Sequence, residues 1–290
     1  MNLMPRFKDI RSKINYAIEN EQCHGMFLPR FCISHILTKT NLCKLFTIDT
    51  DCFKVVFTPS IMASRLWANP KYYHKSLEIY RNFCRPGDCI VDIGANIGIV
   101  TLTCASIVGS NGIVISIEPH PVTHKYLKQN VRLNNLSNVK LYQLAVGNER
   151  GKVSFSNYID DSINKISYNG MFQVEIMPLD DIISVDRSID LLKIDVEGYE
   201  RCVFEGASKT LENVKNIYFE VLSKDDFYST IFPILEKKGF SIYIPKKDKL
   251  IPLNLDNQSQ QDRQGEIPDL IASRDIKEFL KRTGYHEVAL

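Results

Sequence analysis

The stretch that decides the fold is residues 89–98, Cys-Ile-Val-Asp-Ile-Gly-Ala-Asn-Ile-Gly. Its apolar, β-branched half carries a single acid, Asp92, and stops at Gly94, which is typical of a buried strand that runs into a turn. The next segment, 96–108, has the length of a helix. A strand, a glycine turn and a helix N-terminus in this order form a place where backbone N–H groups and the positive end of the helix dipole face a ligand.

Beyond this unit, apolar runs of strand length alternate with segments of helical periodicity. We predict strands over 113–117, 139–146, 189–194, 217–221, 240–244 and 269–272, and helices over 121–134, 198–211, 227–238 and 276–280. Two alternating segments, 151–157 and 172–176, predict a hairpin inserted before the sheet resumes. Strands that alternate with helices of this length favour a parallel, doubly wound α/β sheet.

The residues ahead of the central strand predict a separate extension. We divide the chain into an N-terminal extension, 1–69, which could form a cap, and a main domain, 70–290, which carries the site. In the extension, apolar spacing predicts an amphipathic helix over 6–20, and 53–57 predicts one strand of a hairpin. We favour packing of the 6–20 helix on the main body, and contact with a partner or a membrane surface is the alternative.

The composition is that of an ordinary globular protein. Of the 290 residues, 44% are hydrophobic, and 36 basic against 34 acidic side chains leave a net charge of +2. This balance gives no indication of nucleic acid or an anionic membrane as the main partner. We expect no transmembrane segment and no secretory signal, because the apolar runs that these require are missing. The eight cysteines lack metal-ligand spacing, so we expect reduced thiols in a cytoplasmic protein.

Acidic residues follow three of the predicted strands. Asp92 precedes the glycine turn, Glu118 ends the second strand, and Asp195 and Glu197 end the fourth. Ligands of doubly wound sheets bind beyond the carboxyl ends of the strands. We therefore expect these acids to meet in one crevice.

The spacing of the glycines in the turn narrows the choice of ligand. Gly94 and Gly98 are four residues apart, not in the G-x-G-x-x-G pattern that lets a pyrophosphate approach the backbone. A negative charge at Asp92 suits a cationic group better than a phosphate, and Glu118 can accept hydrogen bonds from two ribose hydroxyls. A ribose-bearing cofactor with a cationic end and without phosphates is S-adenosylmethionine.

The motifs also resemble those of a known family. Val91–Gly98, Glu118-Pro119, Leu144–Val146 and Lys193–Glu200 together are similar to the motif set of the FkbM-type S-adenosylmethionine-dependent methyltransferases. The resemblance covers about residues 70–245. It implies a class I methyltransferase fold, which is a Rossmann-like three-layer sandwich with a mostly parallel seven-stranded sheet and an antiparallel last hairpin. It also implies O-methylation of hydroxyls on sugars, glycans or polyketides.

The resemblance and the strand ends together assign a set of residues to S-adenosylmethionine. They are Asp92, Gly94, Ala95, Asn96, Gly98, Glu118, Pro119, Ala145 and Asp195. The end of the third strand lacks the acid with which many methyltransferases bind the adenine amino group, so we expect backbone and apolar contacts around Ala145. Two departures from the family pattern, Tyr73-His74 and Asp160–Lys165, lie where an acceptor could be held and leave the acceptor unassigned.

Asp195 and Glu197 are the candidate catalytic residues. Two residues apart at a strand end, they point to the same side if the strand persists. We expect Asp195 near the methionine end or the acceptor, and Glu197 as the base that removes the hydroxyl proton or as a clamp on the acceptor. The alternative for Glu197 is capping of the helix that starts near Gly198. Lys193 points away by alternation or reaches back toward the crevice.

Two further chemistries concern the same strand ends. Asp195 with Asp92 could bind a divalent ion, but no third ligand is evident, so we predict no metal site. His120 could act as a base, although we favour a place on the surface rim for this residue.

Three functions stay open at this point. We favour an S-adenosylmethionine-dependent O-methyltransferase that acts on a sugar, a glycan or another small hydroxylated metabolite. The glycine spacing and the charge of Asp92 disfavour a nicotinamide-dependent oxidoreductase. A non-catalytic interaction protein on a methyltransferase scaffold is the other alternative, for which the departures at His74 and 160–165 leave room. The sequence does not indicate the oligomeric state.

Overall fold

The computed structural model shows two compact units, 1–76 and 77–290, which we describe separately. The division falls at Ser76–Leu77, slightly beyond the predicted boundary after residue 69. The residues that the structure describes are 27–158, 160–184, 187–253 and 269–288. The helix predicted over 6–20 and nearly all of the polar stretch 252–267 lie outside the described residues.

The described part of the first unit, residues 27–76, contains short helices and a β-hairpin. Its elements are α2 (Phe27–Lys39), the 3-10 helix η1 (Leu42–Leu45), β1 (Thr47–Asp49), β2 (Lys54–Val56) and α3 (Ile61–Ala68). The antiparallel pairing of β1 and β2 confirms the hairpin predicted around 53–57. Trp67 of α3 stacks on Phe57 with the ring centroids 4.8 Å apart, which joins the helix to the hairpin.

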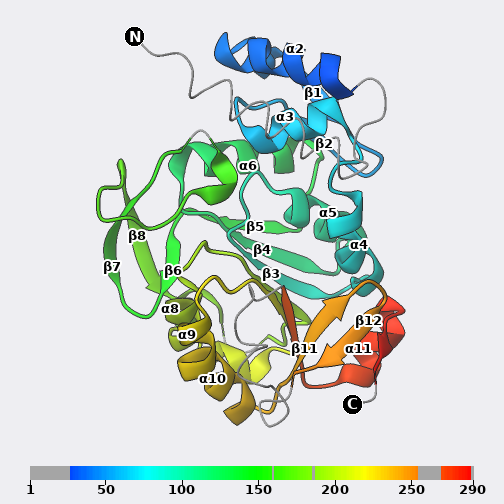
Figure 1. Ribbon diagram of the computed structural model, residues 1–290, viewed down its shortest axis with the longest axis vertical. Coiled ribbons are helices and arrows are strands. Elements are labelled where there is room, and N and C mark those ends of the chain that lie inside the picture. Colours follow the sequence, from blue (N-terminus) through cyan, green and yellow to red (C-terminus); the bar gives the residue numbers. More distant parts are fainter. Residues whose placement is uncertain (1–26, 159, 185–186, 254–268, 289–290) are drawn as a thin grey trace. The chain divides into compact units, whose positions relative to one another are not determined.

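The second unit is built on a nine-stranded sheet (Figure 1). From one edge to the other, its strands are β14 (His286–Glu287), β12 (Lys249–Pro252), β11 (Ser241–Lys246), β13 (Leu270–Ser273), β10 (Asn216–Phe219), β9 (Leu191–Ile194), β3 (Cys89–Ile93), β4 (Ile113–Ile117) and β5 (Val139–Tyr142). The strands from β10 to β5 are parallel, and β13 runs antiparallel between β10 and β11. This confirms the predicted class I methyltransferase fold, and β12 and β14 extend the sheet beyond the seven predicted strands.

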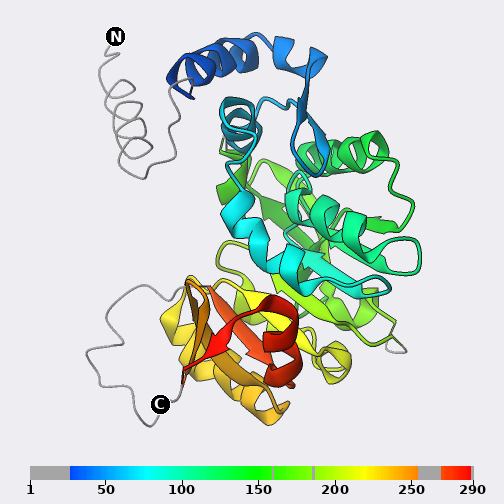
Figure 2. The ribbon, with the colours of Figure 1, turned by 90° about the vertical axis from the view of Figure 1, so that its right-hand side faces the viewer.

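Helices cover both faces of this sheet (Figures 1 and 2). One face carries α4 (His74–Phe83), α5 (Ile99–Val108), α6 (Pro121–Leu133) and α11 (Ile276–Thr283). The other face carries α8 (Glu200–Glu205), α9 (Lys224–Asp226), the π-helix η4 (Phe227–Ile231) and α10 (Phe232–Lys237). On this second face Phe204 of α8 packs edge-on against Phe219 of β10, with the ring centroids 5.3 Å apart. α6 buries one apolar stripe, as the periodicity predicts, whereas α5 is buried on most sides.

The single strand predicted over 139–146 is wrong, because the chain forms two strands in two sheets there. β5 ends at Tyr142, whose carbonyl oxygen accepts the N–H of Glu118 at 3.0 Å. The chain then turns into a three-stranded sheet of β6 (Ala145–Gly147), β8 (Phe172–Pro178) and β7 (Gly151–Phe155). The apolar residues continue across the break, although β6 is buried throughout and β5 only in part. The antiparallel pairing of β7 and β8 confirms the predicted hairpin.

The composition led us to expect reduced cysteines and no transmembrane segment. All six cysteines whose side chains are described are free thiols, and Cys89 and Cys104 are buried as predicted. None of the described helices is both long enough and apolar enough to cross a membrane.

Substitution of Gly94 tests how closely β3 approaches the end of β9. Gly94 has φ of +75°, and a Cβ atom there would lie 1.8 Å from the backbone oxygen of Asp195. We expect Gly94→Ala to lower the free energy of unfolding by about 3 kcal/mol or more, because the left-handed backbone and the overlap add. Gly239→Ala is the matched control, since Gly239 has φ of +78° and open space around it. It should cost only about 1–2 kcal/mol, and equal losses in urea denaturation would contradict the close approach.

Candidate functional site

Four neighbouring parallel strands, β4, β3, β9 and β10, have their carboxyl ends along the same side of the sheet. We call this side, where the strands end, the strand edge. Ile93 of β3 is in register with Ile117 of β4 and with Ile194 of β9, and Ile194 is in register with Phe219 of β10. The residues that follow these ends therefore lie side by side, and they are the turn 94–98, Glu118, Asp195 with Glu197, and Glu220. The sequence predicts the first three of these ends. Glu220 is missed, because the predicted strand 217–221 runs past it, whereas β10 ends at Phe219.

The glycine turn is held by the neighbouring strand. The N–H groups of Gly94 and Ala95 both donate to the carbonyl oxygen of Ile117, at 3.0 and 3.1 Å. Two of the donors that were expected to face a ligand are thus satisfied within the fold. Asn96 and Gly98 have left-handed φ values of +50° and +97°, and Gly98 is the N-cap of α5. These conformations let the chain pass from β3 into α5 in one tight turn.

A buried lysine connects the ends of β3 and β9. Asp92 is fully buried, accepts a hydrogen bond from Thr101 Oγ1 at 2.7 Å and lies 3.3 Å from Lys193 Nζ. Lys193 Nζ also lies 3.3 Å from Asp195 Oδ2 and donates to the carbonyl oxygen of Gly94 at 2.8 Å. Burial disfavours the ammonium, but the carboxylates of Asp195 and Asp92 outweigh burial and raise the pKa of Lys193. Lys193 thus reaches back to the strand ends, and it balances the charge of Asp92 inside the fold.

Glu118 lies at the position predicted to bind ribose. Its side chain is 6% exposed, and its two oxygens accept the N–H groups of Asn96 and His120, each at 2.8 Å. Burial raises the pKa of Glu118 to about 7, against the lowering effect of these two hydrogen bonds. Each carboxylate oxygen has a second lone pair that a hydroxyl can use. The fold therefore holds this glutamate in place with acceptor capacity left over.

His120 is buried and structural, so its predicted place on the surface rim is wrong. Its Nδ1 accepts the N–H of Thr123 at the N-cap of α6, and its Nε2 lies 3.2 Å from Asn157 Oδ1. Its ring meets Phe172 of β8 edge-on, with the centroids 4.9 Å apart. Burial lowers the pKa of His120. The inserted hairpin covers this histidine, and Pro119 lies in the short loop between it and Glu118.

Ala145 lies in the second sheet rather than at the end of β5. It pairs with Ile176 of β8 and packs in a small apolar cluster with Phe155 and Val174. The position contributes to the packing of that sheet. Its predicted contact with the cofactor stays a prediction.

The inserted hairpin also reaches the edge of the main sheet. Asn96 Nδ2 donates to the carbonyl oxygen of Asp161 at 3.0 Å, and the charge of Asp161 adds to the forces that raise the pKa of Glu118. The ammonium of Lys165 acts on Glu197, where it partly offsets a rise in pKa. The segment 160–165, which departs from the family pattern, therefore borders both the glycine turn and the acids of β9.

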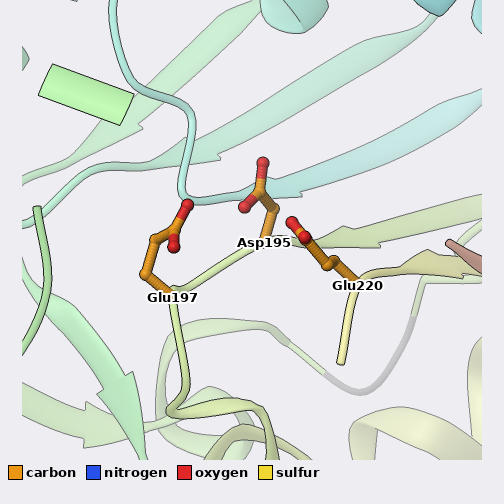
Figure 3. Close-up of side chains that lie close together, drawn as sticks. All are labelled: Asp195, Glu197 and Glu220. Atoms are coloured by element: carbon orange, nitrogen blue, oxygen red, sulfur yellow. The ribbon is translucent and has the colours of Figure 1, made fainter. Parts of the chain in front are cut away.

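Asp195, Glu197 and Glu220 form a carboxylate cluster at this edge (Figure 3). One oxygen from each side chain lies within 4.8 Å of the others, and all three residues are partly buried. Burial, followed by the charge of Asp195, raises the pKa of Glu197 and of Glu220 to about 7. Near neutral pH, a substantial fraction of each glutamate is therefore protonated and a substantial fraction is ionised.

The carboxylate cluster supplies the third acid that the sequence does not reveal. Asp92, the partner considered for Asp195, is paired with Lys193 instead, and Glu197 and Glu220 lie beside Asp195 (Figure 3). Three carboxylates at this spacing repel one another, and either a bound proton or a bound cation relieves the repulsion. The raised pKa values of Glu197 and Glu220 correspond to the binding of a proton.

The backbone at Glu197 has an unusual conformation. Its φ is +56°, and the next residue, Gly198, has φ of +96°. A left-handed non-glycine residue costs on the order of 1–2 kcal/mol, and such residues concentrate at functional sites. The helix after the turn, α8, begins at Glu200 and has no side-chain cap at Tyr199, and it is Glu200, not Glu197, whose carboxylate accepts the N–H of Gly198 at 2.7 Å. The turn instead directs the Glu197 carboxylate toward Asp195 (Figure 3).

Substitution of Lys193 tests the buried link between the strands. Lys193→Met should lower the free energy of unfolding by about 3–5 kcal/mol, because it leaves Asp92 buried without a counter-ion. The second change Asp92→Asn removes that charge and should recover a large part of the loss in chemical denaturation. The control is Lys215→Met, because Lys215 pairs with Asp190 at 2.8 Å but its side chain is 55% exposed. It should cost less than about 1 kcal/mol. A double variant no more stable than Lys193→Met would contradict this account.

Comparison with known proteins identifies the family of this chain. Residues 92–242, just over half of the chain, match the family model of the methyltransferase FkbM domain. Methyltransferase 1 of Beauveria bassiana is 27% identical over 232 residues, which cover 69% of this chain and 90% of that protein. The 31-O-demethyl-FK506 methyltransferase FkbM of Streptomyces tacrolimicus is 26% identical, over 57% of this chain and 77% of that protein.

A third relative, the hexuronic acid methyltransferase AglP of Haloferax volcanii, is 26% identical over 46% of this chain and 56% of that protein. The matched span contains the glycine turn, Glu118, Lys193 and the whole carboxylate cluster. With its sheet order and these residues in place, the chain belongs to the FkbM methyltransferase family.

Proposed function

We propose that this methyltransferase uses S-adenosylmethionine to methylate a hydroxyl group of a sugar, a glycan or another small hydroxylated molecule. The observation that carries the proposal is the carboxylate cluster at the strand edge. Glu197 and Glu220 have pKa values raised to about 7, beside the glycine turn of the family motif. Transfer to an alcohol requires a positioned group that accepts the hydroxyl proton, and a pKa near the working pH suits that task.

The strand ends fit a cationic, ribose-bearing cofactor. Glu118 has acceptor capacity for ribose hydroxyls, and the carboxylates at this edge outnumber the ammonium groups of Lys193 and Lys165, which favours a positive ligand. Bound S-adenosylmethionine supplies a methyl group on a positively charged sulfur that is prone to displacement. A pyrophosphate could not accept hydrogen bonds from the N–H groups of Gly94 and Ala95, because both already donate to the carbonyl oxygen of Ile117. The oxidoreductase alternative is therefore disfavoured.

In this proposal the protein positions the acceptor and takes its proton. The ionised form of Glu197 accepts the proton of the hydroxyl group. The left-handed backbone at Glu197 directs its carboxylate toward the carboxyl ends of the strands. Glu220 makes Glu197 more basic through its charge. Asp195, paired with Lys193, keeps the edge of β9 in place. A base of this kind typically contributes about 10²–10⁴-fold to the rate.

The charge of the site favours a hydroxyl over a carboxylate acceptor. A carboxylate acceptor carries no proton to remove at neutral pH, and the three acids of the cluster would repel it. The choice between a hydroxyl and a carboxylate acceptor matters in this family, because the relative from Haloferax volcanii is named for hexuronic acid, which carries both groups. A neutral glycoside is therefore the better match to this chain.

Assays of methyl transfer that compare neutral sugar acceptors with acidic ones test the proposal. Label from S-adenosylmethionine should pass to neutral glycosides rather than to the corresponding uronic acids, and the product should resist alkali, as an ether does. An alkali-labile ester would overturn the hydroxyl acceptor. Binding of S-adenosylhomocysteine without turnover on a broad panel would favour the non-catalytic alternative, and absence of that binding in calorimetry would overturn the cofactor.

The pH–rate profile should follow the carboxylate cluster. We expect kcat to fall about tenfold per pH unit below about pH 7, because only ionised Glu197 accepts a proton. Glu197→Gln should lower kcat by about 10²–10⁴-fold. Glu220→Gln should move the whole profile to lower pH, since the charge of Glu220 helps to raise the pKa of Glu197.

The control for this profile is Glu236→Gln, which makes the same change at an exposed position of α10. It should leave both kcat and the profile as they are. A Glu220→Gln profile that coincides with that of the unmodified enzyme would show that the two glutamates are not coupled.

Cofactor binding should depend on the protonation of Glu118. Ribose hydroxyls donate more strongly to the carboxylate than to the protonated acid, so the affinity for S-adenosylhomocysteine should fall as the pH drops below about 7. Glu118→Gln should weaken binding about 10–100-fold and remove most of the pH dependence. Calorimetry over this pH range measures both effects. Glu175→Gln, at an exposed position of β8, should change neither, and a Glu118→Gln variant with the original pH dependence would assign the titration to another group.

A further inference from the structure

The first unit exposes an unusual number of large apolar side chains. Five such side chains lie between residues 33 and 46, and the most exposed are Leu45 at 78% and Ile36 at 64%. The other three are Ile33, Leu42 and Phe46. So many exposed aliphatic groups in one short segment are typical of an interaction surface.

Among the described side chains of this segment, large apolar groups are exposed while small ones are buried. Ile33 and Ile36 are three residues apart on α2 and share a face, and Leu42 and Leu45 share a face of η1. Among the side chains that the structure describes in these two helices, the buried ones are Ser34 and Cys43. This is the reverse of the pattern expected for helices that face water.

All formally charged residues of the same segment are basic. Residues 27–48 contain Arg30, Lys39 and Lys44 but no aspartate or glutamate. Within the described part of the chain, no acid forms an ion pair with these three cations, whereas the acids that follow at 49 and 51 pair with Lys54 and Lys71. The net charge of +2 for the whole chain hides this local surplus.

We propose that the α2–η1 face, meaning the exposed apolar and basic side chains of residues 30–45, binds the surface of a bilayer that contains anionic lipids. The headgroups would neutralise the cations while the isoleucine and leucine side chains enter the acyl boundary. A nucleic acid would match the cations but offers no apolar layer for four aliphatic side chains. A second copy of this face would oppose like charges. The proposal does not depend on the methyl acceptor.

Vesicle binding by the full chain tests this proposal. The chain should co-sediment with phosphatidylcholine vesicles that contain phosphatidylglycerol, much less with vesicles of phosphatidylcholine alone, and less again at high salt. Lys39→Gln with Lys44→Gln should weaken binding to the anionic vesicles about 25-fold, at about fivefold for each cation. Ile36→Ser with Leu45→Ser should weaken binding to both kinds of vesicle. Both changes are at exposed positions, and circular dichroism checks that the variants fold.

Two control variants make equivalent changes in the second unit. Lys125→Gln with Lys128→Gln removes two exposed cations of α6, and Tyr168→Ser with Met171→Ser removes two exposed apolar side chains. Both should bind vesicles as the unmodified chain does. Binding that is absent, that ignores lipid charge, or that falls equally in the controls would overturn the proposal. A dimer in light scattering that Ile36→Ser with Leu45→Ser dissociates would instead assign the face to a second copy.

Discussion

The ammonium of Lys193 is the group on which the strand edge depends. It lies between the carboxylates of Asp92 and Asp195 and donates to the carbonyl oxygen of Gly94, so one side chain connects the end of β9 to the end of β3 and to the glycine turn. Buried charges are costly unless each has a partner. The strands can therefore meet only in a geometry that satisfies all three groups, and that geometry requires a glycine at position 94.

With Lys193 engaged by Asp92 and Asp195, Glu197 and Glu220 form no ion pair among the described residues, although the charge of Lys165 partly offsets the rise in the pKa of Glu197. Glu197 and Glu220 face Asp195 and each other, and their pKa values rise to about 7 as a result of burial and repulsion. The left-handed backbone at Glu197 shows that the fold accepts local strain to keep this arrangement. A single buried pairing thus shapes both the stability of the edge and the acid–base chemistry available next to it.

Charge is separated between two regions of this chain. The strand edge of the second unit concentrates carboxylates, whereas residues 27–48 carry cations and no acids. The net charge of +2, a sum over all 290 residues, shows neither region, so composition alone indicates no charged partner. Sums over a whole chain lose this information, because binding responds to the field within about 10 Å of a surface.

The sequence by itself determined the alternation of strands and helices, the bounds of β3 and β4, the glycine turn and the family, because these follow from periodicity and motifs within single elements. Only the tertiary structure decided that Glu220 joins Asp195 and Glu197, that His120 is buried, and that the 139–146 run divides between two sheets. The physical reason is the same in each case. Periodicity reports which side of one element is buried, but a pKa, a counter-ion or a strand partner depends on distances between elements that are far apart along the chain.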